Sequence, residues 1–495
     1  MGIPTPPNHS LKHCPGLAFV LKLQVMGAES FRVEHDSLGE VKVPSHVLYG
    51  VQTQRGVENW PISGMKEPEA FIRTYVAIKR AAAVVNHSLG MLEKEKADAI
   101  VEAADDVLKK NKHLDSFVID VFQAGAGTSF NMNVNEVLSN LAAQLKGKPL
   151  GDYKFIHPND DVNRAQSTND TFPTAIRIST LLEHPKLVKV VEDTIKTFEK
   201  KAKDFDKVLT SARTHLQDAV PIRLGQEFDA YAESIRKDLA RLEFARSELE
   251  YLNIGGTAAG TGMNSHPDYP KKMAEELSKT LGLSLKRGKH LVELSQNMSD
   301  VSFYSAALRN LALTLTKIVN DLRLLSSGPI TGLNEIFLPA LQPGSSIMPG
   351  KVNPSALEML NMVCFQVIGN DTTVSYSTQA GQLQLNVMMP VISFNILMSL
   401  KILTNGLRVC NELCFAGITP NEEKCRQYFE ESMGLATALN TVVGYEKAAT
   451  VVKKAIKEKK RITDLVVEMG YLTPEEVKKY FGSNLTEPGF ISKKG

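Results

Sequence analysis

The chain has 495 residues, 43% of them hydrophobic, which is enough to bury a large core in two or three domains. Its 57 basic and 55 acidic side chains nearly cancel to a net charge of +2, which argues against nucleic acid as the main partner. Five cysteines without a C-x-x-C pair argue against a disulfide framework or a zinc site and fit a reducing compartment, so we expect a cytoplasmic protein.

Residues 1–30 are expected to form a flexible N-terminal extension. The run "LAFVLKLQV" (17–25) has the apolar character of a secretory signal, but Lys22 interrupts it and no clean cleavage site follows. Met26 is an alternative start. A flexible extension is therefore the favoured interpretation.

Residues 31–166 combine short helical stretches with polar loops, which predicts an N-terminal helical domain. Two loops, "GAGTSFNMNVNEV" (125–137) and "HPNDDVNRAQSTNDTFPT" (157–174), are rich in small hydroxyl and amide side chains. "STND" is as often a helix cap as a ligand site. "HPNDD" could be imagined as a metal site, but an exposed loop is the favoured interpretation.

Residues 167–420 carry a repeated helical pattern. Apolar residues recur at steps of three and four from Leu187 to Val208, from Phe228 to Leu252 and from Leu308 to Leu325. Each stretch of about 24 residues would span about 36 Å as a helix. Two more apolar helices are predicted at 355–375 and 390–415. Strand-like alternation is nearly absent, so the fold class is all-α, with a long central bundle of five helices.

The most apolar part of this bundle is "VMMPVISFNILMSLKIL" (387–403), which contains Pro390, Asn395 and Lys401. No window of about 18 uncharged apolar residues occurs, so we expect no membrane span. The segment is predicted to be a helix buried on most sides.

Three loops interrupt the bundle. "SARTHLQDAVP" (211–221) is a polar loop. "NIGGTAAGTG" (253–262) could suggest a phosphate cradle, but no G-K-[ST] follows and no strand precedes it, so it is taken as a tight interhelical turn. "PGSSIMPGKVNPSALE" (343–358) carries glycines and prolines that predict a bent loop of defined shape before a helix.

After "GITPNEE" (417–423), residues 421–495 are predicted to form a small C-terminal helical domain. Its segment "YLTPEEVKKYF" offers a threonine cap and a proline at a helix start.

The polar loops together supply mostly neutral hydrogen-bond donors with one lysine and one histidine. Such a set suits a small dianion, because neutral donors hold a carboxylate without the desolvation cost of many cations. Alone, His215 is as easily a core or capping histidine as a functional one. The set comprises Thr128, Ser129, Asn131, Ser167, Thr168, Asn169, Thr214, His215, Ser345, Ser346, Lys351 and Asn353.

With "GSSIMPGKVNP", "HPNDDVNRAQSTNDTFPT", "RTHLQDAVP" and "GGTAAGTGMN" in this order, the chain resembles the aspartase/class II fumarase superfamily over essentially 27–489. The resemblance implies a three-domain fold and a homotetramer with a twenty-helix core, in which loops from three subunits build each site. It also implies a small dicarboxylate substrate. We expect no cofactor; activation by a divalent metal is possible but not readable from the sequence. A non-catalytic helical scaffold would not need the intact hydroxyl–lysine–asparagine loop.

Within that superfamily, the resemblance favours deamination of L-aspartate to fumarate and ammonia, through proton removal from Cβ and an aci-carboxylate intermediate. "AGTSFNMN", "QSTND" with its Thr168, and "NDLRLLSSGP" look like aspartase, whereas "TALNTVVGYEKAA" leans toward fumarase. The alternative is a class II fumarate hydratase, which interconverts L-malate and fumarate.

Roles for single residues follow from the same resemblance. Ser345 would be the general base, with its alkoxide stabilised by loop N–H groups and nearby positive charge. Lys351 and Asn353 would bind the α-carboxylate with Thr214. The β-carboxylate would be held by Thr128, Ser167, Thr168 and Ser346, with Ser129 in the same loop. Asn169, His215 and Thr128 would contact the amino group, and Glu358 would be the acidic partner of His215.

Four positions depart from the superfamily pattern: Asp161 for a histidine of a secondary anion site, Ile330 for an arginine, Ala212 for a glycine and Val442 for a histidine. None removes a proposed catalytic residue, but Ile330 could alter subunit contacts.

Overall fold

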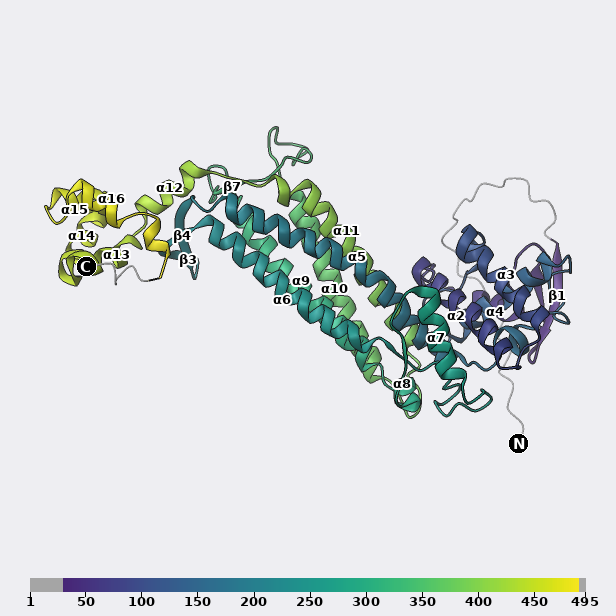
Figure 1. The fold of residues 1–495 in the computed structure, drawn as a ribbon. Coiled ribbons are helices and arrows are strands. Elements are labelled where there is room, and N and C mark those ends of the chain that lie inside the picture. Colours follow the sequence, from purple (N-terminus) through teal and green to yellow (C-terminus); the bar gives the residue numbers. More distant parts are fainter. Residues whose placement is uncertain (1–29, 489–495) are drawn as a thin grey trace.

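A computed structural model describes residues 30–488, so the expected extension, with the 17–25 segment and Met26, lies outside the described residues. The molecule is elongated, with an N-terminal part at one end, a central helical bundle and a C-terminal part at the other end (Figure 1). Most described residues are helical, which confirms the all-α class. The division into domains at 30, 166 and 420 stays a prediction.

Five long helices form the bundle, as predicted, and each is about as long as or longer than its apolar stretch. They are α5 (Thr168–Asp204), α6 (Leu224–Glu248), α9 (Ser299–Leu325), α10 (Ser355–Gln379) and α11 (Met389–Leu413). α10 packs between α9 and α11, and α5 packs against α6 and α11. Leu187, Val191 and Phe198 of α5 are fully buried, so the apolar stripe faces the core.

α11 is the helix predicted to be buried on most sides. Of the described residues, the helical segment Met389–Gly417 alone is long and apolar enough to cross a bilayer, and 56% of its most apolar window is buried in the molecule. Ser393, Asn395 and Ser399 on this helix are buried too. This burial is typical of a core helix.

The N-terminal part is helical apart from one hairpin. Its elements are β1 (Phe31–Asp36), β2 (Gly39–Pro44), α1 (Val51–Asn59), α2 (Glu69–Ser88), α3 (Lys94–Lys110), α4 (Thr128–Leu145) and three short helical turns, η1 (Leu114–Ser116), η2 (Gly125–Gly127) and η3 (Pro158–Val162). The hairpin was not predicted. Its alternation covers only six residues, and the buried member of β1 is the polar Glu34, so hydropathy does not reveal the strand.

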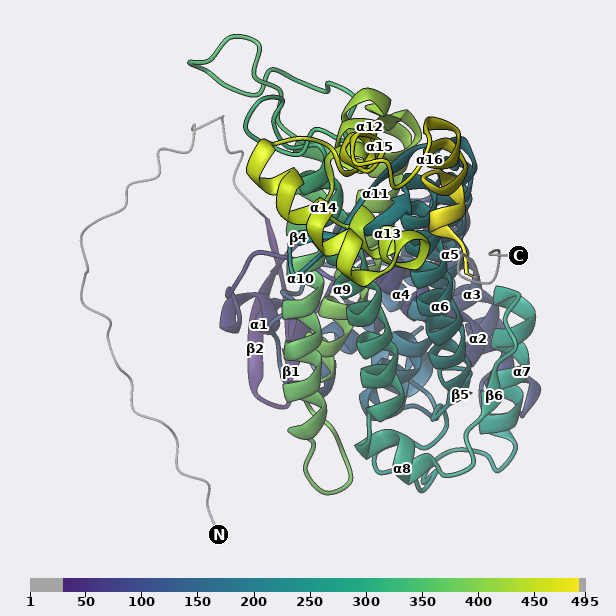
Figure 2. The same ribbon diagram turned by 90° about the vertical axis from the view of Figure 1, so that its left-hand side faces the viewer.

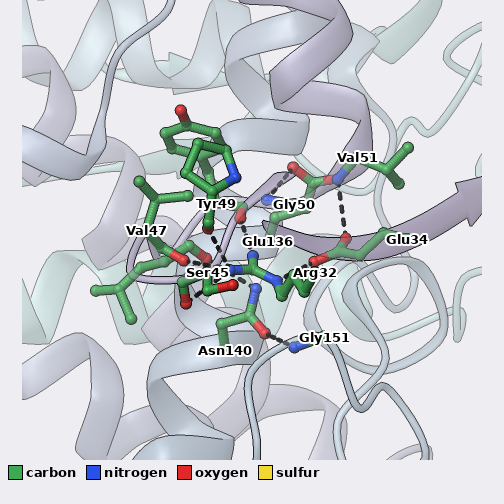
Figure 3. Close-up of polar contacts among 12 residues, drawn as sticks. Arg32, Glu34, Ser45, Val47, Tyr49, Gly50, Val51, Glu136, Asn140 and Gly151 are labelled. Carbon is green, nitrogen blue, oxygen red and sulfur yellow. Dashed lines mark hydrogen bonds and ion pairs between the residues drawn. The ribbon is translucent and has the colours of Figure 1, made fainter. Parts of the chain in front are cut away.

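Polar contacts attach this hairpin to α1, and α1 to α4 (Figure 3). Arg32 Nη1 donates to the carbonyl oxygens of Pro44 and Val47 at 2.9 Å, and Glu34 Oε2 accepts from the Val51 N–H at 2.9 Å. Glu136 of α4 accepts from backbone N–H groups in the first turn of α1, including that of Gly50. Carboxylates at a helix N-terminus satisfy N–H groups that lack helical partners, so this network fixes α1 on α4.

Short elements connect and follow the bundle. They are β3 (Leu209–Thr214), β4 (Gln217–Arg223), β5 (Tyr251–Leu252), α7 (Tyr269–Leu281), β6 (Lys286–Arg287), α8 (Leu291–Gln296), β7 (Ile336–Phe337), η4 (Phe415–Gly417), β8 (Thr419–Pro420), α12 (Glu422–Glu431), α13 (Leu435–Val443), α14 (Tyr445–Glu458), α15 (Ile462–Glu468), α16 (Pro474–Tyr480) and η5 (Ser483–Thr486). The last helices enclose their own small hydrophobic cluster. Thr473 caps α16 with Pro474 at its start, as predicted.

Candidate active site

The predicted site residues fall into two groups at opposite ends of the bundle (Figure 1). The proximal group lies where α4 and α5 begin: Thr128, Ser129, Ser167, Thr168 and Asn169. The distal group lies on the β3–β4 hairpin and around the loop before α10: Thr214, His215, Ser345, Ser346, Lys351, Asn353 and Glu358. α5 alone has 37 residues, so it separates the groups by about 55 Å. One chain does not bring them together.

The proximal group is built around two helix N-termini. Ser167 caps α5: its Oγ accepts from the Asn169 N–H at 3.2 Å, while Asp170 accepts from the Ser167 N–H at 3.0 Å. Ser167 is therefore a helix cap, and the role of "STND" as a ligand site stays a prediction. Thr128 opens α4 and is exposed, whereas Thr168 is buried. Helix N-termini attract anions, so a carboxylate can bind where these helices begin.

The glycine-rich segment 253–262 is held against the start of α5. Asp170 Oδ2 accepts from the N–H groups of Gly255 at 3.0 Å and Thr257 at 2.9 Å. A two-residue strand, β5, precedes the segment, contrary to prediction. These two N–H groups are occupied by Asp170, which fits the predicted turn between helices and not a phosphate cradle.

The start of α4 rests on a buried acid. Gln123 Oε1 accepts from the Phe130 N–H at 2.9 Å, and Gln123 Nε2 donates to Glu67 Oε1 at 3.4 Å. Glu67 is 4% exposed, and its Oε2 has no hydrogen-bond partner among the described residues. Burial raises the pKa of Glu67 to about 8, so this carboxyl is neutral at lower pH.

Glu67→Gln is expected to stabilise the protein more as the pH rises. The pKa of Glu67 rises from 4.5 to about 8 on folding, so between these values the folded state retains a proton that the unfolded state has released, and stability falls as the pH increases. The glutamine variant lacks this loss, which is on the order of 4 kcal/mol by pH 8. Tm values of both proteins at pH 5 and pH 8 test this. An equal difference at both pH values would contradict it.

The distal loop 343–353 has the bent shape that its glycines and prolines predict. Gly344 N donates to the Lys351 carbonyl oxygen at 2.7 Å, and Asn353 Nδ2 donates to the Gly344 carbonyl oxygen at 2.7 Å. A Cβ on Gly344 would lie 2.5 Å from that Lys351 oxygen, so only glycine fits the close approach. The loop projects from the end of the bundle (Figures 1 and 2).

Within this loop, two backbone N–H groups point at the Ser345 hydroxyl. Ser345 Oγ accepts from Ile347 N–H at 3.2 Å and from Met348 N–H at 3.0 Å. Hydrogen bonds from N–H groups favour the alkoxide form over the alcohol. Ser345 is half-buried, while Ser346 and Lys351 beside it are exposed.

The segment 211–221 is a β-hairpin and not the predicted loop. His215 and Leu216 form its turn, both with positive φ (56° and 57°), so the histidine is exposed at the tip. Strands of six and seven residues with mixed polarity give little periodic signal. Among the described residues, Glu358 lies 4.0 Å from Arg323, and the predicted contact with His215 is not formed within one chain.

An ion pair that the sequence analysis missed holds this hairpin. Arg213, next to Thr214, donates to Glu335 Oε2 at 2.7 Å, and Glu335 is fully buried. Glu335 also accepts from the Thr210 hydroxyl. Arg213 belongs to the quoted "RTH" motif, but nothing in the sequence around Glu335 indicates that it pairs with Arg213.

Glu335→Gln is expected to weaken both stability and catalysis. The change leaves Arg213 without a charged partner, and removing one member of a buried ion pair costs about 3 to 5 kcal/mol. The loosened hairpin should lower kcat/KM by about tenfold. Thermal unfolding and steady-state kinetics measure the two effects. Unchanged values for both would show that the pair does not position the hairpin.

Three of the departures can be followed in the structure. Asp161 is buried, and its Oδ1 lies 2.9 Å from Lys96 Nζ, so the two side chains form an ion pair. The "HPNDD" segment is a helical turn and not the predicted loop; Asn159 and Asp160 are exposed as predicted, whereas Asp161 is buried. Ile330 is 90% exposed at the distal end, and Ala212 is half-buried in β3. No cluster of metal-binding side chains occurs in the part of the chain that the structure describes.

Comparisons with known proteins agree with this architecture. A model of the family described as "Lyase" matches residues 39–369, and one described as "Fumarase C C-terminus" matches 435–483. The chain belongs to the aspartase/class II fumarase superfamily. Aspartate ammonia-lyase of Bacillus subtilis (strain 168), a member of this superfamily, is 47% identical over 94% of this chain and 98% of its own. Class II fumarate hydratase of Neisseria meningitidis is 46% identical over 90% of this chain and 96% of its own.

Solved structures of the superfamily show the same fold. A structure described as fumarate lyase:delta crystallin from Brucella melitensis bound to cobalt has a TM-score of 0.90 and 46% identity, covering 93% of this chain and 100% of its own. A class II fumarase from Schistosoma mansoni has a TM-score of 0.89 at 34% identity, with the same coverage.

Proposed function

We propose that this protein is an aspartate ammonia-lyase, which reversibly converts L-aspartate to fumarate and ammonia. The observation that carries the proposal is the Ser345 hydroxyl held by two N–H groups in a loop that also presents Lys351. Relatives named aspartate ammonia-lyase, 43–47% identical over 93% or more of this chain, favour ammonia as the leaving group.

Ser345 is the general base of this reaction. The N–H groups of Ile347 and Met348 stabilise its alkoxide, which removes a proton from Cβ. The electron pair of that C–H bond moves into the β-carboxylate and gives an aci-carboxylate dianion. A carbon–carbon double bond then forms as the Cα–N bond breaks and ammonia departs with its electron pair. Lys351, exposed beside Ser345, binds the α-carboxylate with Asn353 and Thr214.

Thr128, Ser167 and Thr168 of the proximal group hold the β-carboxylate together with Ser346 of the distal group, and Asn169 contacts the amino group. The charge of the β-carboxylate increases as the proton leaves Cβ. The hydroxyl groups of these residues and the positive dipole ends of α4 and α5 stabilise that charge. Such preorganised donors are typically worth about 3 kcal/mol each in the transition state.

The active site is shared between copies of the chain in a homotetramer. Groups about 55 Å apart along α5 cannot bind one four-carbon diacid within a single chain. An antiparallel copy of the bundle places the distal group of one chain beside the proximal group of another. Large apolar side chains are exposed along the bundle, as expected of a face that a copy covers: Phe244, Phe303, Met362, Phe365 and Tyr376.

Two further parts of the proposal concern conditions. Catalysis needs no cofactor, because the proposed chemistry uses only a serine base and hydrogen-bond donors; turnover should persist after treatment with a chelator. A cytoplasmic location fits the four described cysteines, which are free and buried thiols.

The test is to incubate the purified protein with L-aspartate and with L-malate and to follow fumarate absorbance. Turnover of L-aspartate is expected. Turnover of L-malate alone would make the protein a fumarate hydratase, the alternative that the Neisseria meningitidis relative and the fumarase C-terminal match favour. Turnover of neither would indicate a non-catalytic helical scaffold.

A further inference from the structure

A lysine is caged by neutral oxygens behind the proximal group. Lys79 of α2 is fully buried, and its Nζ donates to Asn131 Oδ1 at 2.8 Å, Asn163 Oδ1 at 2.9 Å and Gln166 Oε1 at 3.0 Å. Among the described residues, no carboxylate lies within ion-pair distance of Nζ. Buried cations are ordinarily paired with an acid, so this cage needs a reason.

The three amides are oriented to receive an ammonium group. Asn131 Nδ2 donates to Asn163 Oδ1 at 3.4 Å, and Asn163 Nδ2 donates to the Gln166 carbonyl oxygen. Gln166 Nε2 donates to the carbonyl oxygens of Val162 and Arg164. Their side-chain oxygens are therefore turned toward Lys79. Three acceptors at these distances require three N–H donors, and only the charged ammonium form of lysine has three.

The charge of Lys79 is only partly offset by its surroundings. Burial lowers its pKa to about 7, while the nearby Asp170 raises it. Asp170 itself is occupied by the N–H groups of Ser167, Gly255 and Thr257. The ring of Tyr75 lies 5.6 Å from Nζ. The arrival of a dianion beside this group would favour its charged form further.

The cage joins the two segments that carry the proximal group. Asn131 lies in the first turn of α4, two residues after Ser129, and Gln166 directly precedes the cap Ser167. We propose that Lys79 is a positioning residue: its ammonium fixes the starts of α4 and α5 relative to each other and supplies positive potential to the substrate carboxylate that gains charge. The inference rests on the proposed function.

Asn163→Asp tests the charge separately from the geometry. The substitution keeps an oxygen at each contact that Asn163 Oδ1 makes and pairs Lys79 with a carboxylate. It also replaces the donation to the Gln166 carbonyl with a carboxylate oxygen that faces that carbonyl oxygen. Asn159→Asp is the matched control, because it adds the same charge four residues away, on an exposed side chain with no contact to Lys79. Lys79→Met removes both the positive charge and the three hydrogen bonds that Nζ donates.

We expect Asn163→Asp to lower kcat at least tenfold with less than a threefold change in KM, and to leave the Tm unchanged or higher. Asn159→Asp should keep kcat within twofold of the wild type. Lys79→Met should lower kcat at least as much as Asn163→Asp; if it does not fold, Asn163→Asp still decides. A kcat of Asn163→Asp within twofold of the wild type would overturn the inference, because a purely structural tie tolerates the exchange.

The wild-type assay separates this inference from the proposed function. If the wild type converts L-malate but not L-aspartate, the proposed function fails while the variants remain informative, because both substrates are dicarboxylates. If it converts L-aspartate and Asn163→Asp is unaffected, only the role of Lys79 fails.

Discussion

Replacing Ser345 with alanine is expected to reduce turnover of L-aspartate by about a thousandfold or more, because the reaction loses its base. Ser345 Oγ accepts two loop N–H groups, at 3.2 and 3.0 Å, and this environment is lost with the hydroxyl. The loop is closed at its base by contacts of Gly344, Lys351 and Asn353 that do not involve the hydroxyl, so the fold and the oligomer should persist. Steady-state kinetics and size-exclusion chromatography measure the two outcomes.

Ser346→Ala is the matched control for this experiment. Ser346 is the exposed neighbour of Ser345 in the same loop and is proposed to bind substrate, so its loss should mainly raise KM. If Ser345→Ala retains near-normal kcat, serine is not the base. If Ser346→Ala is the more damaging change, the roles of the two hydroxyls must be exchanged.

Mixing two inactive variants is expected to restore activity. Ser345→Ala damages the distal group and Thr168→Val damages the proximal group, and we propose that each active site takes these groups from different chains. In hybrid oligomers, up to about a quarter of the sites then receive both groups intact. Co-expression of the two variants with different tags, followed by tandem purification and an assay, measures the recovered activity.

A second pair of variants controls for trivial recovery. Ser345→Ala and Lys351→Met alter the same loop of one chain, so no hybrid site can receive both side chains intact, and this pair should stay inactive. Recovery in both mixtures would point to contamination with wild-type protein or to reversion of a mutation. No recovery in the first mixture, with hybrid oligomers present, would show that the two groups do not meet between chains.

Much of the fold could be predicted from the sequence because long helices have a strong local signal. The recurrence of apolar residues from Leu187 to Val208 is repeated over several turns, and α5 covers this stretch as far as Asp204. Capping at Ser167 and Thr473 depends on a few neighbouring residues, so it could also be predicted from the sequence. The β3–β4 hairpin was missed, because its strands are short and the turn at His215 and Leu216 lacks the glycine that usually marks one.

The contacts that support the candidate site were less predictable. Lys79 stands in the apolar stretch "YVAIKRAAAVV", where a single lysine can equally face solvent, and its partners Asn131 and Gln166 are more than fifty residues away. Glu335 likewise finds Arg213 across more than a hundred residues. Such pairings are set by how helices and loops pack, and no periodic pattern reports them.

By itself, the sequence determined the helical class, the five long bundle helices, the bent loop around Ser345 and the family resemblance, since each depends on residues close together in the chain. Only the tertiary structure decided that the proximal and distal groups lie at opposite ends of the bundle. The physical reason is the length of α5: a helix of 37 residues holds its two ends about 55 Å apart.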